Sequence, residues 1–389
     1  MGLPLQYSKQ QISEADIQAV KEVLCSDFLT TGPQVTAFEE MLCAATRARY
    51  AIASSSGTTA LHLSCLALGI KKGDNGITSP ITFLASANCM EFCGGKVDFV
   101  DIDASTLCLS PEQLEKYCRN GQPPAVVIPV DFAGIPADLP AIHVLSQKYG
   151  FKIIEDAAHS LGSTYSYQGK EYPCGCCQHS DLAILSFHPV KTITTGEGGA
   201  VLTNDDKLAE ALRRLRSHGT VKGGKQNSPL DGDWYYQMLS LGYNYRITDI
   251  QCALGLSQLK RLAEFKARRQ SIVKCYNEFF QKNTEFIVPP WPSNTSPCQH
   301  LYPLQIGAGP KKRKLLYDSL KQDRIFTQVH YIPVYWQPYY SKKYGYRQGK
   351  CPEAELYYSR CLSLPLYPTM TDGDCELVES SIKKYMGKK

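Results

Sequence analysis

Lys191 is the residue of this sequence with the clearest capacity for chemistry. It lies between a short apolar run at 182–185 and a glycine-rich turn, and a second apolar run follows at 200–202. Such runs are typical of buried strands, so Lys191 is expected at a strand end, where α/β proteins place functional groups. A lysine partly removed from water can lose its proton near neutral pH and attack a carbonyl. The segment therefore predicts a Schiff-base lysine, suited to an aldehyde such as that of pyridoxal phosphate.

The glycines that follow Lys191 fit a planar cofactor. Because Gly196, Gly198 and Gly199 carry no side chain, the backbone could pass close to a flat ring. A surface lysine in a flexible hairpin is the alternative interpretation, and it would hold for a lysine with no further support. Other stretches of this sequence supply what such a cofactor needs.

Asp156 is the second candidate for catalysis. It follows the apolar stretch FKIIE at 151–155, so its carboxylate is expected at the carboxyl edge of a sheet. A buried aspartate is costly unless it faces a cation. The protonated nitrogen of a pyridine ring is such a cation, and keeping it protonated makes the ring an electron sink. An aspartate that only caps a following helix is the alternative.

A run of small residues, SSSGTT at 54–59, follows a predicted strand and opens a predicted helix. The amino end of a helix offers N–H groups and hydroxyls to a phosphate, although the same residues also serve as plain helix caps. Phe83 begins another predicted helix just past a strand. Its ring could stack on an aromatic cofactor or simply belong to the core.

Length and composition are those of a two-domain soluble enzyme. The chain has 389 residues, of which 43% are hydrophobic and 20% charged, with a net charge of +5 and a pI near 8.4. No basic cluster is dense enough for nucleic acid, because KKRK at 311–314 is better explained as the start of a solvated helix. No apolar run approaches the roughly 18 residues of a membrane span. We therefore expect a cytoplasmic chain without nucleic-acid or membrane partners.

The sequence contains 16 cysteines, which we expect to be reduced thiols because the chain is too long to need disulfides. One cluster, PCGCCQH at 173–179, gathers Cys174, Cys176, Cys177 and His179. Structural zinc sites usually combine two well-separated ligand pairs, and no partner pair is evident. No metal is predicted, and a metal or redox sensor built on this cluster is the alternative.

The order of apolar segments predicts the fold class. Ser13 and Asp16 resemble a capping box ahead of a helix that reaches about Leu24, and a second helix reaches about Thr46. Short apolar strands then alternate with helix-like stretches, near Ala51, Ile77, Val97, Ala125 and Ile153. Such alternation predicts an α/β fold with a mostly parallel central sheet and helices on both faces.

A change of pattern after about Ile250 predicts a second domain. One long helix is expected over 250–280, with apolar positions such as Leu259 and Phe265 on a buried face. We assign residues 1–255, including the N-terminal helical segment, to a large cofactor-binding domain. Residues 256–389 form a smaller C-terminal α/β domain, with WPSNTSPC at 291–298 as a loop inside it.

Together these motifs resemble one family over nearly the full length of the chain, the DegT/DnrJ/EryC1/StrS sugar aminotransferases, within the fold-type I pyridoxal phosphate enzymes. The segments that carry the resemblance are FLTTGP, SSSGTTALHL, SPITFLASANC, FVDID, EDAAHSLGS, SFHPVKTITTGEGGAVLTND, RSHG, GYNYRITDIQCALGLSQL and QVHYIPVY. The resemblance implies a fold-type I aminotransferase with pyridoxal 5'-phosphate as cofactor.

Within the family, the resemblance is greatest to the transaminases of pseudaminic acid biosynthesis. It implies that an amino group passes from L-glutamate to C4 of a UDP-4-keto-6-deoxy-hexosamine, namely a UDP-2-acetamido-2,6-dideoxy-4-keto-hexose. The product would be UDP-4-amino-4,6-dideoxy-N-acetyl-β-L-altrosamine. A related 4-aminotransferase for another nucleotide sugar, of the perosamine or bacillosamine type, is the alternative, because it would share the cofactor residues.

The resemblance also implies roles for individual residues. Lys191 would bind the cofactor and move the proton, and Asp156 would face the pyridine nitrogen. Cofactor contacts are implied for Lys191, Gly57, Thr58, Phe83, Asp156, His159, Ser186 and Asn244. Substrate contacts are implied for Tyr7, Asp27, Phe28, Leu29, Thr30, Gln328, Val329, His330 and Tyr331. Asn244 would reach the phosphate across a homodimer interface, so that the active site is shared between subunits.

Three further interpretations stay open. His188 could border the cofactor or only pack beside it. The aromatic run from Tyr331 to Tyr346 could stack on uracil or line a subunit contact, and tyrosine-rich interfaces are common. A cofactor-binding regulator without turnover is the rival from another class, although no DNA-binding module supports it. A dehydratase relative would carry histidine in place of Lys191.

Overall fold

A seven-stranded sheet forms the centre of the computed structural model, which describes residues 4–222 and 232–386. Its strand order is β1-β9-β8-β5-β4-β2-β3, and β9 alone runs opposite to the other six strands. The bounds are β1 (Tyr50–Ser54), β2 (Asn75–Thr78), β3 (Lys96–Phe99), β4 (Val126–Ile128), β5 (Lys152–Asp156), β8 (Leu182–Ser186) and β9 (Gly199–Thr203). The predicted mostly parallel sheet is confirmed, and near-continuous burial of its strands fits coverage on both faces.

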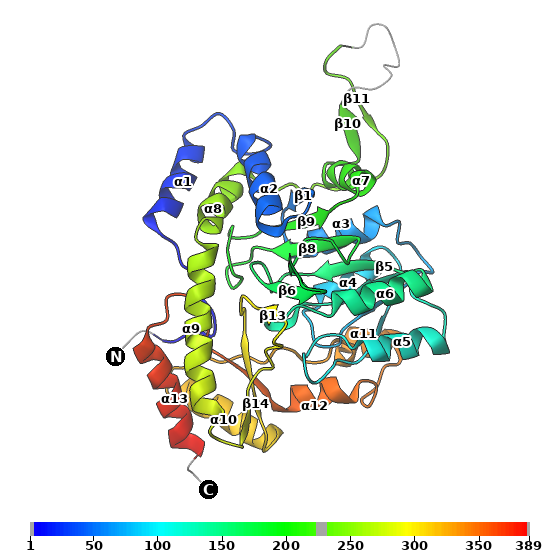
Figure 1. Cartoon of the computed structure of the whole chain (residues 1–389). Coiled ribbons are helices and arrows are strands. Elements are labelled where there is room, and N and C mark those ends of the chain that lie inside the picture. The colour runs from blue at the N-terminus through cyan, green and yellow to red at the C-terminus, as the bar shows by residue number, and fades with distance from the viewer. Residues whose placement is uncertain (1–3, 223–231, 387–389) are drawn as a thin grey trace.

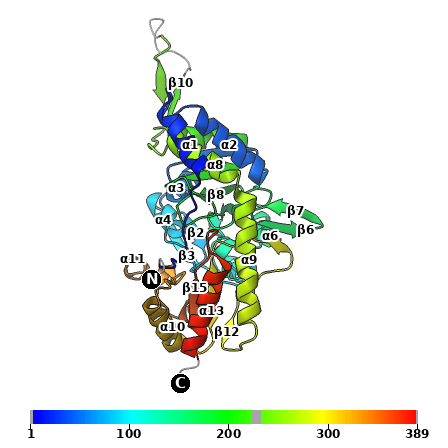
Figure 2. The same ribbon diagram turned by 90° about the vertical axis from the view of Figure 1, so that its left-hand side faces the viewer.

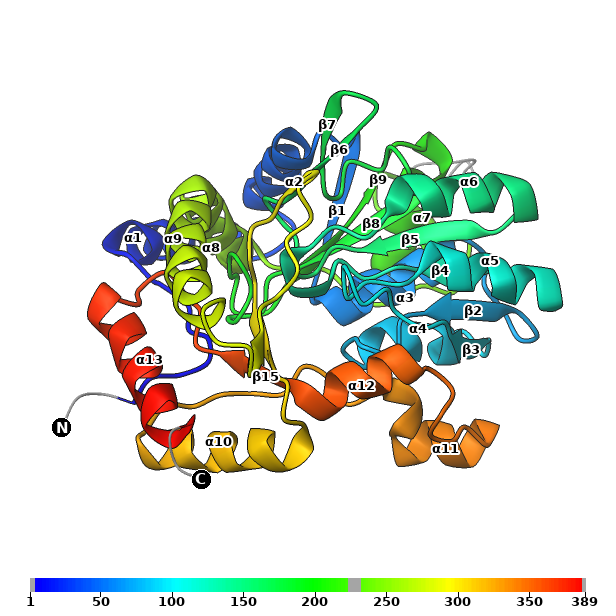
Figure 3. The same cartoon turned by 60° about the horizontal axis from the view of Figure 1, so that its bottom comes forward.

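Helices cover both faces of this sheet (Figures 1 and 3). They are α3 (Gly57–Ala67), α4 (Ala85–Phe92), α5 (Pro111–Asn120), α6 (Leu139–Tyr149) and α7 (Asp206–Arg216). Helix α3 packs on β8 and β9, and α6 packs on β5. A small hairpin, β10 (Thr220–Lys222) with β11 (Tyr236–Met238), projects beyond α7 (Figure 1).

The two N-terminal helices form as the sequence predicts. Helix α1 (Glu14–Leu24) begins at a capping box in which Ser13 and Asp16 satisfy each other's backbone N–H groups. Helix α2 (Pro33–Thr46) has proline in its first turn, where the missing N–H costs nothing. Both helices pack against α8 (Asp249–Leu259), as Figure 2 shows.

The prediction of a single helix over 250–280 is wrong, because the structure divides this stretch into α8 and α9 (Leu262–Phe280). At the break, Arg261 takes the N-cap position of α9 with φ −101° and ψ 5°. Its guanidinium pairs with Glu264 at 3.0 Å and lies 3.8 Å from the buried carboxylate of Asp16. Neither glycine nor proline marks this break, so the apolar pattern gives no stop signal.

The C-terminal part has a hydrophobic core of its own. A sheet of β12 (Phe286–Ile287), β14 (Tyr302–Ile306) and β15 (Cys361–Leu364) is packed with α9, α10 (Pro310–Gln322) and α13 (Asp372–Met386). Helix α10 begins just before KKRK, as predicted. The N-terminal Leu5 joins this core and pairs with Ile325, while the N–H of Phe326 donates to the Leu5 carbonyl at 2.8 Å. The domain division after residue 255 stays a prediction.

One C-terminal segment adds a strand to a small second sheet. The loop predicted at 291–298 contains β13 (Thr295–Ser296), which pairs with β6 (Thr164–Tyr167) in a three-stranded sheet completed by β7 (Lys170–Pro173). The rest of the segment is loop, as predicted, and this pairing places it beside β6. No helix among the described residues is long and apolar enough to cross a membrane.

The aromatic run from Tyr331 to Tyr346 is used largely for packing within the chain. It contains α11 (Pro338–Tyr344), and α12 (Pro352–Arg360) follows it. Tyr340 and Tyr346 pack on Phe99, and the Tyr346 hydroxyl donates to the Val97 carbonyl at 2.7 Å. These contacts fasten the run to the β3 edge of the sheet.

Candidate active site

A cavity of about 820 Å³ lies where β5 and β8 end. The first turn of α3, the segment before α4 and residues 328–332 complete its walls. It is lined by the candidate residues Lys191, Asp156, Gly57, Thr58, Phe83, His159, Ser186, Tyr7, Gln328, Val329, His330 and Tyr331, and also by His188. The carboxyl ends of parallel strands therefore bring together residues that are far apart in the sequence.

Lys191 enters this cavity from the turn after β8. Its backbone N–H donates to the His188 carbonyl at 2.8 Å, which fixes the turn. Burial lowers the pKa of Lys191 to about 8, and the nearby carboxylate of Asp156 opposes this shift. A substantial fraction of the amine is then uncharged at neutral to mildly alkaline pH, as a nucleophile or a base requires.

Asp156 ends β5 and is 4% exposed. Its Oδ2 accepts from the Ser86 hydroxyl at 2.6 Å, and its Oδ1 accepts from the Ala158 N–H at 3.2 Å. Burial raises the pKa of Asp156, whereas these two donors and Lys191 favour the charged form. Among the described residues it has no ion pair within 4.0 Å, so a cation in the cavity would compensate its charge.

The first turn of α3 forms a cradle for an anion. Ser56 caps the N–H of Thr59, whereas the N–H groups of Gly57 and Thr58 have no acceptor within the described part of the chain. A Cβ at position 57 would lie only 2.8 Å from the Cβ of Ser186, so glycine is needed for this close approach. Free N–H groups at a helix start, beside a serine hydroxyl, suit a phosphate.

Three buried histidines crowd the opposite wall. The His159 and His300 rings have centroids 4.4 Å apart, and the Tyr331 hydroxyl lies 3.4 Å from His159 Nε2. His330 Nδ1 is 2.8 Å from the Ser363 hydroxyl. Burial lowers the pKa of all three rings, and that of His330 falls to about 3. They are neutral at physiological pH and do not compete with a cation for Asp156.

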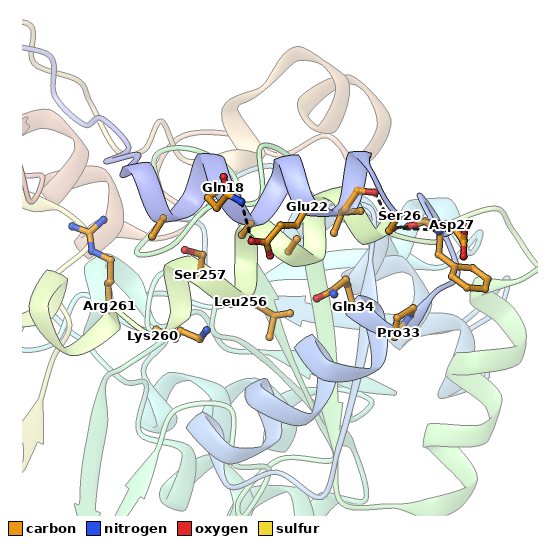
Figure 4. A pocket seen from close by; sticks show the side chains of 15 residues that line it. Gln18, Glu22, Ser26, Asp27, Pro33, Gln34, Leu256, Ser257, Lys260 and Arg261 are labelled. Atoms are coloured by element: carbon orange, nitrogen blue, oxygen red, sulfur yellow. Dashed lines mark hydrogen bonds between the residues drawn. The ribbon is translucent and has the colours of Figure 1, made fainter.

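Two sets of candidate residues lie outside this cavity. One chain by itself therefore does not bring all the candidate residues together. Asn244 is exposed and bridges to Ser217. Residues 27–30 are exposed too, with the Leu29 carbonyl accepting from the N–H of Asp249. Asp27 and Phe28 instead line a separate groove of about 670 Å³ between α1, α2 and α8 (Figure 4). Neither set lines the cavity that holds Lys191.

The glycines after Lys191 also serve a different purpose from the predicted one, because they do not line the cavity. A Cβ on Gly199 would meet the Ser56 carbonyl oxygen at 2.4 Å. A Cβ on Gly198 would meet the Thr195 hydroxyl oxygen at 2.2 Å. The missing side chain of Gly199 therefore lets β9 approach the first turn of α3, whereas Gly198 allows close packing against Thr195 in the preceding turn.

Sequence reasoning missed several residues that line the cavity: Thr82, Ser86, Glu197, His300 and Gln337. Ser86 lies three residues after Phe83, in the same motif, so its small hydroxyl could have been noticed. His300 has no such signal. It reaches the cavity because its N–H donates to the Ala133 carbonyl at 2.9 Å, in a contact between distant segments.

The cysteine cluster at 173–179 does not gather around one point. Among the described residues, one group of potential metal ligands has its atoms within 4.8 Å of one another: Asp131, Glu155 and Cys174. Cys176 and Cys177 do not belong to it, and His179 Nδ1 lies 2.8 Å from the Tyr165 hydroxyl. The group is buried, and the hydrogen bonds of both carboxylates stay within the protein.

Comparison with known proteins gives one consistent result. The profile of the DegT/DnrJ/EryC1/StrS aminotransferase family matches residues 10–383. The Bacillus subtilis spore coat polysaccharide biosynthesis protein SpsC is 38% identical over 382 residues, covering 97% of this chain and 96% of the relative. The Campylobacter jejuni UDP-4-amino-4,6-dideoxy-N-acetyl-β-L-altrosamine transaminase is 36% identical over 379 residues, covering 97% and 96%.

A solved structure agrees over nearly the whole length. Helicobacter pylori PseC, an aminotransferase involved in the biosynthesis of pseudoaminic acid, superposes with a TM-score of 0.89. Its sequence is 31% identical, and the match covers 98% of this chain and 99% of that chain.

Pyridoxal phosphate is the cofactor of these aminotransferases, and the cavity fits it. The fit rests on a partly buried amine, a buried carboxylate without an ion-pair partner and a helix start with free N–H groups. The match over most of the chain and this cavity lead to one conclusion: the chain is a member of the DegT/DnrJ/EryC1/StrS aminotransferase family.

Proposed function

We propose that this aminotransferase moves the amino group of L-glutamate to C4 of UDP-2-acetamido-2,6-dideoxy-4-keto-hexose. The product would be UDP-4-amino-4,6-dideoxy-N-acetyl-β-L-altrosamine, a precursor of pseudaminic acid, made in the cytoplasm. The observation that carries the proposal is a weakly basic lysine facing a buried aspartate across one cavity. The Campylobacter relative whose name contains this product supports the choice of substrate.

Lys191 is the catalytic base in this proposal. When bound, pyridoxal phosphate withdraws electrons from the carbon that carries the amino group, which makes its proton acidic. The uncharged Nζ of Lys191 removes that proton from the donor and later delivers a proton to C4 of the sugar. A pKa of about 8 suits both directions of transfer.

The cofactor contacts follow from the walls of the cavity. Gly57 and Thr58 would donate their N–H groups to the phosphate, with the Ser186 hydroxyl beside them. Asp156 would hold a positive charge on the ring nitrogen. The His159 ring and the exposed face of Phe83 both line the cavity and would border the cofactor ring.

The substrate would enter along the opposite wall. Tyr7 lines it beside His330, with ring centroids 5.4 Å apart. Gln328, Val329 and Tyr331 continue this wall, and Tyr331 is tilted toward Phe83 with ring centroids 6.5 Å apart. Polar groups on an aromatic wall suit a sugar.

A homodimer would complete the site. Asn244 and residues 27–30 lie outside the cavity of their own chain, and exposed apolar side chains accompany both. They are Phe28 and Leu29 in the first set and, within ten residues of Asn244 in the sequence, Trp234, Tyr236, Met238, Leu239 and Leu241. A second copy that covers them would remove apolar area from water and could present Asn244 to the other chain's phosphate cradle.

Mixed dimers test the shared site. Lys191→Ala and Asn244→Ala homodimers should each be nearly inactive. Random co-assembly of the two variants makes half of the dimers mixed, and each mixed dimer has one site with both residues intact. Co-expression should therefore restore about a quarter of the wild-type activity. Recovery of no activity from verified mixed dimers would contradict a site shared in this way.

Product analysis tests the substrate. The purified protein, loaded with pyridoxal phosphate, is incubated with L-glutamate and a panel of 4-keto nucleotide sugars. Mass spectrometry and proton NMR then report which sugar gains an amine and the configuration at C4 and C5. We expect the altrosamine product. Preference for a perosamine or bacillosamine precursor would replace this substrate and leave the aminotransferase assignment intact.

A further inference from the structure

A second cluster of reactive side chains lies between α3 and α4, away from the cavity. His62 and Cys65 are three residues apart on α3, so both project from one face of that helix. Cys89 lies on α4, and Cys93 follows its last turn four residues later. Because α3 packs against α4, the two pairs face each other.

Cys65 lies next to both other thiols, although the three sulfurs do not all lie within 4.8 Å of one another. The side chain of Cys65 interacts with those of both Cys89 and Cys93. Cys65 and Cys89 are fully buried, whereas Cys93 keeps contact with solvent. The arrangement thus offers one thiol that a small reagent can reach and one buried thiol directly behind it.

The surroundings of Cys93 favour its thiolate. Its contact with the Cys65 thiol, and then the nearby His62 ring, lower the pKa of Cys93 to about 6, while the pKa of Cys65 is raised. His62 is 5% exposed, and its Nε2 has no hydrogen-bond partner among the described residues. Its Nδ1 lies 3.1 Å from the hydroxyl of Tyr245, a further titratable group near Cys93. A thiolate beside a second thiol is the arrangement of exchange-active cysteine pairs.

We propose that Cys93 and Cys65 form a thiol–disulfide exchange site that accepts low-molecular-weight disulfides of the glutathione class. The Cys93 thiolate attacks one sulfur of the disulfide, which forms a mixed disulfide and releases one small thiolate. Cys65 then attacks Cys93 Sγ, its proton passes to the second leaving thiolate, and a Cys65–Cys93 disulfide results. Two protein thiols are oxidised, and one small disulfide is reduced to two thiols.

The site is separate from the active site, although the same helices serve both. Gly57 and Thr58 begin α3, whereas Cys65 is near its end. Ser86 lies in the first turn of α4, whereas Cys93 follows its last. The disulfide would join the far ends of the two helices whose first turns line the cavity. A bound metal is disfavoured, because these ligand atoms are not among the described groups that converge within 4.8 Å.

Peptide mapping of the intact reduced protein tests the proposal. After exposure to oxidised glutathione, the remaining thiols are alkylated and the protein is digested with trypsin. Cys65 lies in fragment 50–71, and Cys89 and Cys93 lie in fragment 73–96. We expect the two fragments to be joined through Cys93, while the exposed Cys25 carries at most a glutathione adduct.

Matched variants assign the sulfur. Cys93→Ser should abolish the link, whereas Cys89→Ser, in the same fragment, should retain it. Both variants should keep wild-type transamination. A link through Cys89, no link in the wild-type protein, or a stoichiometric metal lost in Cys93→Ser would each overturn the proposal.

Alkylation kinetics give a measurement without mutation. At pH 6 about half of Cys93 is thiolate, against roughly 0.3% of an ordinary thiol with a pKa of about 8.5. A thiolate of lower pKa is also a weaker nucleophile, which reduces the resulting rate advantage by roughly tenfold. Cys93 should then react with iodoacetamide about tenfold faster than the cysteine of an unstructured peptide. A rate at or below the peptide's would count against the site.

Discussion

Glu155 and Asp156 are neighbours on β5, yet their carboxyl groups meet opposite surroundings. Successive residues of a strand point to opposite faces of the sheet. Asp156 faces the cavity with Lys191 and Ser86. Glu155 faces the protein interior, where its Oε1 accepts from the Gly175 N–H at 2.9 Å and its charge meets that of Asp131.

Burial raises the pKa of both carboxyl groups, but the cost of burying the two groups is compensated in different ways. Glu155 and Asp131 are fully buried acids in contact, and burial raises the pKa of Asp131 to about 6 and that of Glu155 well above its usual range. A proton shared between the two carboxyl groups removes their charge repulsion, so this pair needs no ligand from outside the protein. Asp156 has no such partner and depends on what enters the cavity. The difference separates a structural acid from a functional one.

Removal of the amine on the cavity side should have the largest effect. Lys191→Ala takes away the base for both proton transfers, so kcat should fall by at least about 10³-fold. Lys321→Ala, on the exposed face of α10, is the matched control and should leave kcat unchanged. Single-turnover assays with glutamate measure the first half-reaction directly. A Lys191→Ala protein with wild-type turnover would refute the role of this residue.

Neutralising the functional acid should come next. Asp156→Asn keeps the size of the side chain but removes the charge that holds the ring nitrogen protonated. We expect kcat to fall roughly a hundredfold while the fold is retained. The absorbance spectrum of the bound cofactor should change as well. If the variant kept both the spectrum and kcat, the cavity-side acid would be no more functional than its neighbour.

Neutralising the structural acid should leave activity almost unchanged. Glu155→Gln keeps an acceptor for Gly175 and offers a donor to Asp131, so kcat should stay within about twofold. Glu155→Ala leaves the N–H of Gly175 and the carboxyl of Asp131 without this partner. Its free energy of unfolding should drop by about 2–4 kcal/mol. Denaturant unfolding of both variants measures this difference. Equal losses of unfolding free energy in the two variants would contradict it.

The smallest expected effect is a pH dependence of stability. The folded pKa of Asp131 is about 6, above its usual 3.8, so the folded state binds a proton more tightly than the unfolded chain does. This contribution to stability is fully present below about pH 4 and is lost as the pH rises through 6. Asp131→Asn should remove that part of the Tm decline, by a few degrees. Parallel Tm profiles of the two proteins would contradict it.

Much of the fold and the cavity could be predicted because local signals mark them. Lys191 and Asp156 follow apolar strands, and the SSSGTT run opens a helix, so their place at strand ends follows from the parallel sheet. The shared capping of Ser13 and Asp16 is equally local. Such features depend on neighbours in the sequence.

What could not be predicted depends on distant contacts. His300 reaches the cavity through a contact with the distant Ala133, and the break at Arg261 coincides with its contact to the distant Asp16. Asn244 lies outside the cavity of its own chain, so the role implied for it depends on a second chain. Periodicity and motif spacing carry no information on such encounters.

The pairing of Leu5 with Ile325 has a consequence for synthesis in the cell. The partner of this early apolar residue leaves the ribosome about 320 residues later, which takes roughly 15 to 60 seconds at usual translation rates. Until then Leu5 lacks the residue with which its backbone pairs. The nascent chain must shield its own beginning, or rely on a chaperone, before the last layer closes over it.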